Sequence, residues 1–239
     1  MPWLLLLVAT PILTVVGYFS RLPWLLPLLQ ILPAYPLMLR DLRKGKTMLA
    51  VLRMLAWAFA VAVTGETLAL HFPETGAASV IHGAAYRDEM LAWVRTGIGR
   101  ESSVQQFLPE HLFHLLVFVG LSLATASLAS LALGAALVNY MSFYVGSLMG
   151  IAERPATILF YGWPPWALLR VVAYVILGVV LSGPLLQRLA GVPFAWRTRR
   201  AWFAAAGAAL LLDVVLKAAL APAWSVLLRS ALFPLTPGL

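Results

Sequence analysis

The sequence contains no cysteine and few charged residues. Cysteine is missing from all 239 positions, and only 11% of the residues are charged, whereas a soluble domain carries about 25%. The missing thiols exclude disulfide bonds, thiolate metal sites and catalysis by a cysteine nucleophile. The scarcity of charge is untypical of a soluble domain and indicates a chain that lies largely in lipid.

Apolar residues are abundant in the same sequence. They make up 62% of it, and the mean hydropathy is +0.90. Several stretches of about 18 residues or more carry at most one charged side chain, which is the length of a membrane-spanning helix. The alternating segments of about ten residues that a membrane barrel needs are absent. The sequence therefore predicts an all-α fold, a polytopic integral membrane bundle of about six to seven transmembrane helices with an outer amphipathic helix.

The whole chain, 1–239, is expected to form a single membrane domain. Its apolar stretches fall at 3–20, 23–39, 47–71, 108–130, 132–152, 164–187 and 201–221. Residues 1–39 are rich in proline, which bends helices, so they are expected to form a hairpin or one span. Residues 108–152 carry no charged side chain after Glu110 and are too long to cross a core of about 30 Å once. They are expected to form a helical hairpin that turns between Ser130 and Gly134.

Lysine and arginine gather around two loops, near residues 40–53 and 188–200. Basic loops favour the cytoplasmic side, so both are predicted to be cytoplasmic. The second loop joins the last two spans, which are predicted within residues 164–221. The segment 72–107 then lies outside the cytoplasm. Within it, residues 86–97 (YRDEMLAWVRTG) predict a short amphipathic helix whose apolar side chains, Met90, Leu91, Trp93 and Val94, rest on the membrane surface.

Several titratable side chains fall inside the predicted spans, where each charged group costs about 2.5–3.5 kcal/mol. The predicted orientation puts the following in the outer half of the membrane: Glu66, His111, His114, Arg170, Asp213 and Lys217. We expect them to meet in a polar cavity that opens to the extracytoplasmic side, together with Glu89 of the outer segment. Asn139 is the candidate from the inner half. The alternative is that polar groups near helix ends simply reach the interface.

Asp213 and Lys217 are four residues apart, with the acid first. This spacing places them on one face of a helix with favourable polarity. One interpretation is a self-neutralising pair that lowers the cost of insertion. The other is an intramembrane polar pair that handles protons or substrate in the cavity.

Glu110, His111 and His114 stand together at the start of a long apolar run, FLPEHLFHLLVF. In a helix His114 shares a face with either neighbour, so the three could bind a divalent metal with a further ligand such as Glu66. They could also serve as catalytic acid–base groups. In a third interpretation, Pro109 and Glu110 begin the helix, where an acid complements the helix dipole.

Small residues recur every four positions at Ser122, Ala126, Ser130 and Gly134. Such strips allow helices to approach closely in lipid. The strip predicts packing within one protomer, with a dimer face as the alternative.

The layout of residues 47–222 resembles stage II sporulation protein M and its relatives. In both, a span and an outer segment precede a helix pair rich in small residues, with Asn139 and Gly146 late in that pair here. The relatives usually show Asn-Gly where this chain has Asn139-Tyr140. The resemblance implies a membrane subunit of a larger assembly and brings no catalytic residues with it.

The sequence thus favours a scaffold or permease-like subunit of the cell membrane, as in a bacterial inner membrane. Its N-terminus is cytoplasmic if residues 1–39 cross twice. The alternative is an integral membrane enzyme, hydrolase-like and dependent on a metal or on acid–base groups, that uses Glu110, His111 and His114. A haem or quinone protein is less favoured, because the histidines lie on one side of the membrane. The expected partners are the lipid bilayer and other membrane subunits or further copies of the chain. Nucleic acid is excluded, since the net charge of +8 comes from short clusters between apolar segments.

Overall fold

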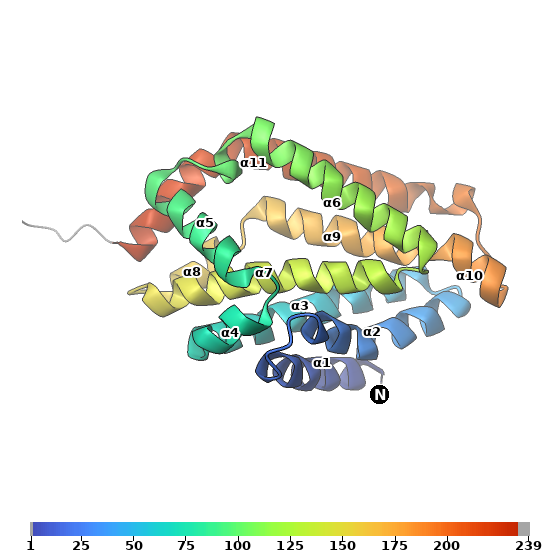
Figure 1. The fold of residues 1–239 in the computed structure, drawn as a ribbon. Helices are drawn as coiled ribbons and strands as arrows, with labels where there is room; N and C mark the ends of the chain where they lie inside the picture. The colour runs from blue at the N-terminus through green and yellow to red at the C-terminus, as the bar shows by residue number, and fades with distance from the viewer. Residues whose placement is uncertain (1, 234–239) are drawn as a thin grey trace, which may run out of the picture.

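The computed structural model describes residues 2–233, and all regular elements among them are helices (Figure 1). They are α1 (Pro2–Phe19), α2 (Leu25–Arg43), α3 (Thr47–His71), α4 (Pro73–Ser79), α5 (Gly83–Thr96), η1 (Arg100–Ser102), α6 (Val104–Ala124), α7 (Leu128–Ile151), α8 (Pro155–Tyr161), α9 (Pro165–Leu181), α10 (Gly183–Ala190), η2 (Trp196–Arg199) and α11 (Arg200–Leu232). Six of the described segments are long and apolar enough to cross a membrane: α1, α3, α6, α7, α9 with α10, and η2 with α11. The all-α prediction is confirmed, while α2 does not meet the criterion for a span.

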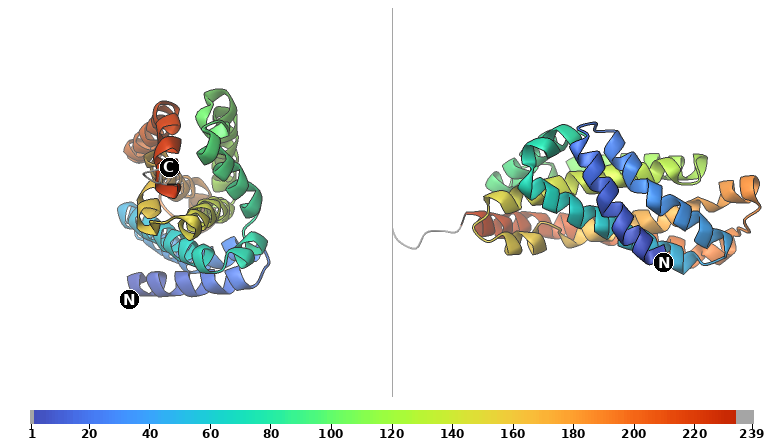
Figure 2. Two further views of the ribbon diagram at one scale, coloured as in Figure 1. Left: turned by 90° about the vertical axis from the view of Figure 1, so that its left-hand side faces the viewer. Right: turned by 90° about the horizontal axis from the view of Figure 1, so that it is seen from below.

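Helices α3 and α7 form the centre of the molecule and contact each other extensively. Helices α1 and α2 cover one side of this pair, and α6, α9 and α11 lie on the other (Figure 2). Gly146 of α7 permits the close approach, because a Cβ atom there would stand 2.6 Å from the Cβ of Ala69 and 2.6 Å from the carbonyl oxygen of Glu66. The backbones of α3 and α7 therefore meet at a point that no other residue fits.

A buried amide pair fastens α2 to α7. The amide of Gln30 donates to the side-chain oxygen of Asn139 at 3.0 Å, and Asn139 donates back at 2.8 Å. The Gln30 amide also reaches the Thr14 hydroxyl of α1 at 3.3 Å, and the Trp57 indole of α3 donates to the Gln30 carbonyl at 2.8 Å. Four helices thus share one satisfied polar cluster inside an apolar core.

The turn between α6 and α7 lies earlier than predicted, at residues 125–127 and not between Ser130 and Gly134. Ala126 and Ser127 adopt left-handed backbone angles, with φ of 47° and 68°, and the Ser127 hydroxyl donates to the carbonyl of Gly178 in α9. Glycine or asparagine usually marks such a turn, and neither residue is present here, so no residue pattern predicts it. The small-residue strip is consequently divided between two helices, and the hydroxyl of Ser122 meets that of Ser130 at 2.8 Å.

Two helix ends also differ from expectation. Helix α6 begins at Val104, which places Pro109 and Glu110 inside the helix, so the interpretation of these residues as its first turn is wrong. Helix α11 continues through Pro222 to Leu232, beyond the predicted end of the span at residue 221. In both helices the chain tolerates a proline that removes one backbone hydrogen bond.

The amphipathic helix exists as α5, but its apolar face lies against protein. Met90, Trp93 and Val94 are buried and pack with residues of α7, α8 and α11. The prediction that these side chains rest on a membrane surface is wrong for this face. Helix α5 is therefore an integral wall of the bundle.

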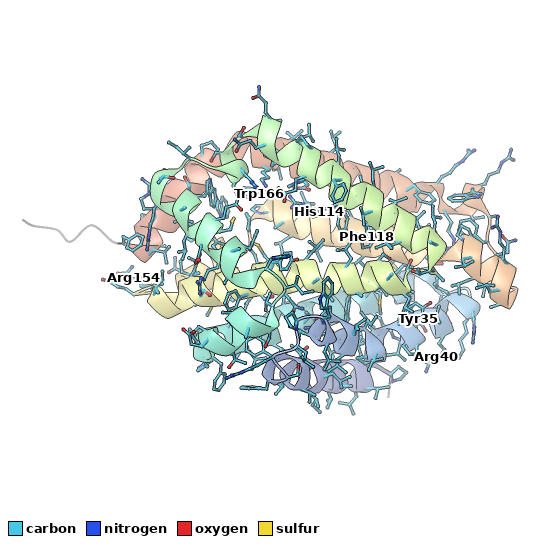
Figure 3. The ribbon with its side chains drawn as sticks, in the orientation of Figure 1. Tyr35, Arg40, His114, Phe118, Arg154 and Trp166 are labelled. Atoms are coloured by element: carbon cyan, nitrogen blue, oxygen red, sulfur yellow. The ribbon has the colours of Figure 1, made fainter. Side chains whose placement is uncertain are left out.

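The two basic loops lie at the same end of the molecule. The guanidinium of Arg199 donates to the hydroxyl of Thr47, which joins η2 to the start of α3. Helices α4, α5 and α8 occupy the other end, and Figure 3 shows Arg40 and Arg154 at these opposite ends. The molecule thus has one strongly basic end and one end built from short helices.

Candidate functional site

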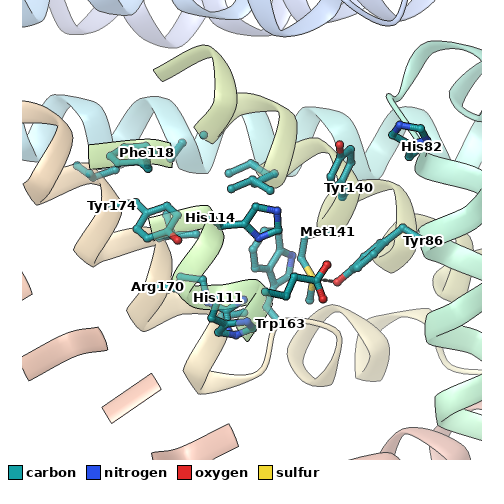
Figure 4. A pocket seen from close by; sticks show the side chains of 18 of the residues that line it. His82, Tyr86, His111, His114, Phe118, Tyr140, Met141, Trp163, Arg170 and Tyr174 are labelled. Atoms are coloured by element: carbon teal, nitrogen blue, oxygen red, sulfur yellow. Dashed lines mark hydrogen bonds between the residues drawn. The ribbon is translucent and has the colours of Figure 1, made fainter. Parts of the chain in front are cut away.

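A cavity of about 490 Å³ lies between α6 and the pair α7 and α9, with α3 behind it and α5 and η1 at its outer end (Figure 4). Small-molecule sites commonly measure about 300–1,000 Å³. Protein interiors otherwise contain few voids larger than a water molecule. A space of this size among the central helices is therefore a candidate binding site.

Polar side chains line the part of the cavity near the short helices. They are His82, Tyr86, Glu89, Arg100, Glu101, Glu110, His111, His114, Tyr140, Trp163 and Arg170. The part toward the middle of the bundle is apolar and includes Trp57, Ala58, Phe118, Leu131, Leu137, Val138, Val171, Tyr174 and Val175. The rings of Phe118 and Tyr174 are stacked there, with their centroids 4.6 Å apart. The cavity therefore changes from polar to apolar along its length.

Arg170 and Asp213 form a bidentate ion pair between α9 and α11. The Nε and Nη2 atoms of Arg170 donate to the two carboxylate oxygens at 2.8 and 2.7 Å. Asp213 is almost fully buried, and this fork geometry satisfies both of its oxygens. Arg170 itself lines the cavity. Because Asp213 belongs to α11, this helix determines how the Arg170 guanidinium is oriented there.

Lys217 is paired with Glu101 of η1, across a distance of 2.8 Å, and its ammonium lies 4.6 Å from the ring centre of Phe107. The spacing of Asp213 and Lys217 correctly predicted that both point from one face of α11, and both are buried. Each, however, pairs with a residue of another element in place of its neighbour on the helix. The interpretation as a self-neutralising pair is therefore wrong.

Glu110, His111 and His114 all reach the cavity from α6. The Glu110 carboxylate lies 3.6 Å from Arg100, which also lies 3.2 Å from Glu89. The Nε2 atom of His111 is buried and has no hydrogen-bond partner in the structure. A buried polar atom without a partner is costly, so this nitrogen is the wall atom most in need of a ligand.

Within residues 2–233, no three side chains of histidine, cysteine, aspartate or glutamate come together in a way that could hold a metal ion. Glu66, the candidate further ligand, accepts a hydrogen bond from the indole of Trp163. The structure therefore does not assemble the predicted metal site around His111 and His114. Glu66 stands behind the cavity wall that Trp163 provides.

Asn139 does not line the cavity. Its side chain faces α2 and is occupied by Gln30, so the expectation that it is a cavity residue is wrong. The neighbouring Tyr140 and Met141 line the cavity in its place. Side chains of α7 face α3, α2, the cavity or other neighbours according to their angle around the helix, and the weakly amphipathic sequence of α7 does not reveal that angle.

Sequence reasoning missed Tyr86 and the aromatic part of the lining. Tyr86 of α5 donates weakly to the sulfur of Met141 at 3.6 Å. Burial, and to a smaller extent the carboxylate of Glu101, raises the pKa of the Tyr86 hydroxyl, so it remains a protonated donor. A partial signal exists on α7, where Leu131, Gly134, Val138 and Met141 recur at helical spacing.

Comparison with protein-family models, curated proteins and solved structures gives no match. Function therefore has to be argued from the cavity itself. Its size, its paired charges and the buried, unpaired Nε2 atom of His111 are the features that a function must use.

Proposed function

We propose that this chain is a multi-pass membrane protein that binds a small molecule in the cavity between α6, α7 and α9, as a permease-like subunit. In this proposal the cavity opens toward the end opposite the basic loops, near its polar wall residues, and that end is the extracytoplasmic side of a cell membrane, as in a bacterial inner membrane. The observation that carries the proposal is the cavity of about 490 Å³ with an ordered set of polar groups on its wall.

The charged groups of the spans support this proposal. Arg170, Asp213 and Lys217 are costly at this depth, and simple bundle packing would be served equally well by apolar side chains. They are instead fixed in pairs around the cavity. Pairing of this kind keeps the wall rigid while the cavity remains open to a ligand.

The resemblance of residues 47–222 in layout to stage II sporulation protein M supports the subunit part of the proposal. The exposed apolar helix faces of such a subunit contact partner subunits as well as lipid. Helix α6 offers such a face in Leu112, Phe113 and Leu116, which are all exposed. Other membrane subunits or a second copy of the chain are the partners that fit this surface.

A second candidate function is an integral membrane enzyme, of a hydrolase-like type, that transfers protons through His111 and His114. The unpaired Nε2 atom of His111 favours it, because a general base needs a nitrogen that is not already engaged in a hydrogen bond. Glu110 is held by Arg100 at the cavity mouth. In this function Glu110 is a positioning residue and does not itself transfer protons.

The absence of cysteine makes the proposal directly testable, since single cysteine variants carry no background thiol. We expect Glu89→Cys and His114→Cys to react with a membrane-impermeant thiol reagent added from the extracytoplasmic side of sealed vesicles. Lys44→Cys is the matched control and should react only from the cytoplasmic side. Reaction of His114→Cys only from the side that labels Lys44→Cys, or from neither side, contradicts a cavity open to the outside.

A further inference from the structure

We infer that the ligand of this cavity is an uncharged amphiphile with a hydroxyl head, a lipid alcohol, whose head binds at His111 and Tyr86 and whose apolar part lies against Phe118 and Leu131. This inference rests on the proposed binding function and specifies its ligand class. Three properties of the wall lead to it: its polarity gradient, its compensated charges and its unpaired polar atoms.

The polarity gradient gives the cavity two different ends. Seven residues separate His111 from Phe118 along α6, which at about 1.5 Å per residue corresponds to about 10 Å. Figure 4 shows Phe118 and Tyr174 at one end of the cavity and His82 and Tyr86 at the other. A purely polar solute would leave the apolar end unsatisfied, and a hydrocarbon would leave the polar end unsatisfied. A molecule with one polar and one apolar end meets both.

The charges of the wall are already compensated. Arg170 is held by Asp213 and Lys217 is held by Glu101. Arg100 lies between two carboxylates, those of Glu89 and Glu110. At the buried pairs of Arg170 and Lys217, a charged head group would have to break an ion pair or remain without a counter-charge, and both are unfavourable there. The geometry therefore selects an uncharged head.

Among the polar groups of the wall, His111 and Tyr86 are poorly satisfied. The Nε2 atom of His111 has no partner, and the Tyr86 hydroxyl has only the weakly accepting sulfur of Met141. Tyr86 needs an acceptor, while the imidazole nitrogen accepts or donates according to its tautomer. A ligand hydroxyl accepts and donates at the same atom, so it is suited to pairing with either of these groups.

The apolar end suits a hydrocarbon chain. Phe118 and Tyr174 stack on one side, and Leu131 and Val175 belong to the same region of the wall. Gly134 of α7 leaves extra space there, since a Cβ atom at this position would lie 3.8 Å from the ring of Phe118. A substitution of Gly134 therefore fills this end of the cavity first.

The test uses photo-crosslinking of the full chain in lipid nanodiscs. The probe is decan-1-ol with a diazirine near the end of its chain. Decanoic acid and decylamine with the same diazirine provide the anionic and cationic controls. We expect the alcohol to crosslink to peptides containing Phe118, Leu131 or Val175, and the charged probes to label these peptides about tenfold less, because they cannot be paired there.

Variants define the site. His111→Phe should reduce labelling by the alcohol about tenfold, through loss of the head-group hydrogen bond. Gly134→Phe should abolish labelling by occupying the apolar end. Leu212→Phe, on an exposed face of α11, is the matched control and should leave labelling unchanged.

The outcomes separate this inference from the proposed function. Equal or stronger labelling of the same peptides by a charged probe overturns the lipid-alcohol inference and leaves a ligand-binding cavity in place. Labelling that survives Gly134→Phe, or that never reaches α6, α7 and α9 with any probe, overturns the inference as well. If His114→Cys is also closed to reagent from the extracytoplasmic side, the proposed function fails with it.

Discussion

Several charged side chains of this protein lie where burial is unfavourable, and Arg170 shows how pairing offsets the desolvation free energy. Its guanidinium binds both oxygens of Asp213 while part of its side chain remains accessible to the cavity. The sequence predicted that these groups need partners, because charge inside a span is unfavourable. It could not predict which partners, since Arg170 and Asp213 come from separate helices and only tertiary packing joins them.

Replacement of Arg170 by glutamine should destabilise the protein by about 3–5 kcal/mol, because the buried carboxylate of Asp213 loses its counter-charge. The double variant Arg170→Gln/Asp213→Asn should recover much of this loss, since no unpaired charge remains. Thermal unfolding in detergent measures both effects. Arg95→Gln, on an exposed part of α5, is the control and should change little. A single variant as stable as this control would show that the pair does not matter for stability.

At the scale of helices, the sequence was most informative where apolar length and charge agree. Helix α3 occupies residues 47–71 as predicted, because polar residues and a proline flank a long stretch that is mostly apolar. The turn at residues 125–127 was misplaced, because left-handed Ala126 and Ser127 are stabilised by contacts that include a bond to Gly178 of a distant helix. Local patterns specify a helix interior well and specify a boundary poorly when tertiary contacts create it.

The amide pair between α2 and α7 should contribute a measurable coupling between helices. Gln30→Leu and Asn139→Leu each leave one amide unsatisfied, so each should destabilise the protein by about 1–3 kcal/mol. In a double-mutant cycle the coupling energy should be about 0.6–1.7 kcal/mol, the range found for hydrogen bonds between membrane helices. Unfolding of the four proteins in detergent gives this value. Additive effects of the two substitutions would show that the amide pair does not couple α2 to α7 energetically.

For the molecule as a whole, both basic loops lie at one end, while the cavity and the short helices point to the other. Lysine and arginine predicted that the two loops lie on one side, and they do lie at one end of the molecule; their cytoplasmic orientation stays a prediction. The sequence also predicted that costly polar groups gather in one half of the spans, and several do so around the cavity, but the buried pair of Arg53 and Asp41 lies toward the basic end. The apolar half of the cavity escaped prediction, because leucine and valine on a cavity wall look the same as leucine and valine facing lipid.

Orientation in the membrane should depend on both basic loops together. The residues to be replaced by glutamine are, in the first loop, Arg40, Arg43, Lys44 and Lys46 and, in the second, Arg188, Arg197, Arg199 and Arg200. Neutralising one loop should preserve orientation, because the other still favours the cytoplasm, whereas neutralising both should give a mixed population. Thiol labelling of Glu89→Cys from each side of the membrane reports the result. Unchanged orientation after both sets of substitutions would show that other features determine it.

The contact at Gly146 has a consequence that reaches the cavity from outside. The missing side chain lets the backbone at Glu66 stand against α7, and Glu66 in turn holds the indole of Trp163, which forms part of the cavity wall. A side chain added at Gly146 would displace the backbone at Glu66 and, through the hydrogen bond of Glu66, the indole of Trp163. The shape of the cavity thus depends in part on Gly146, a residue that does not line it.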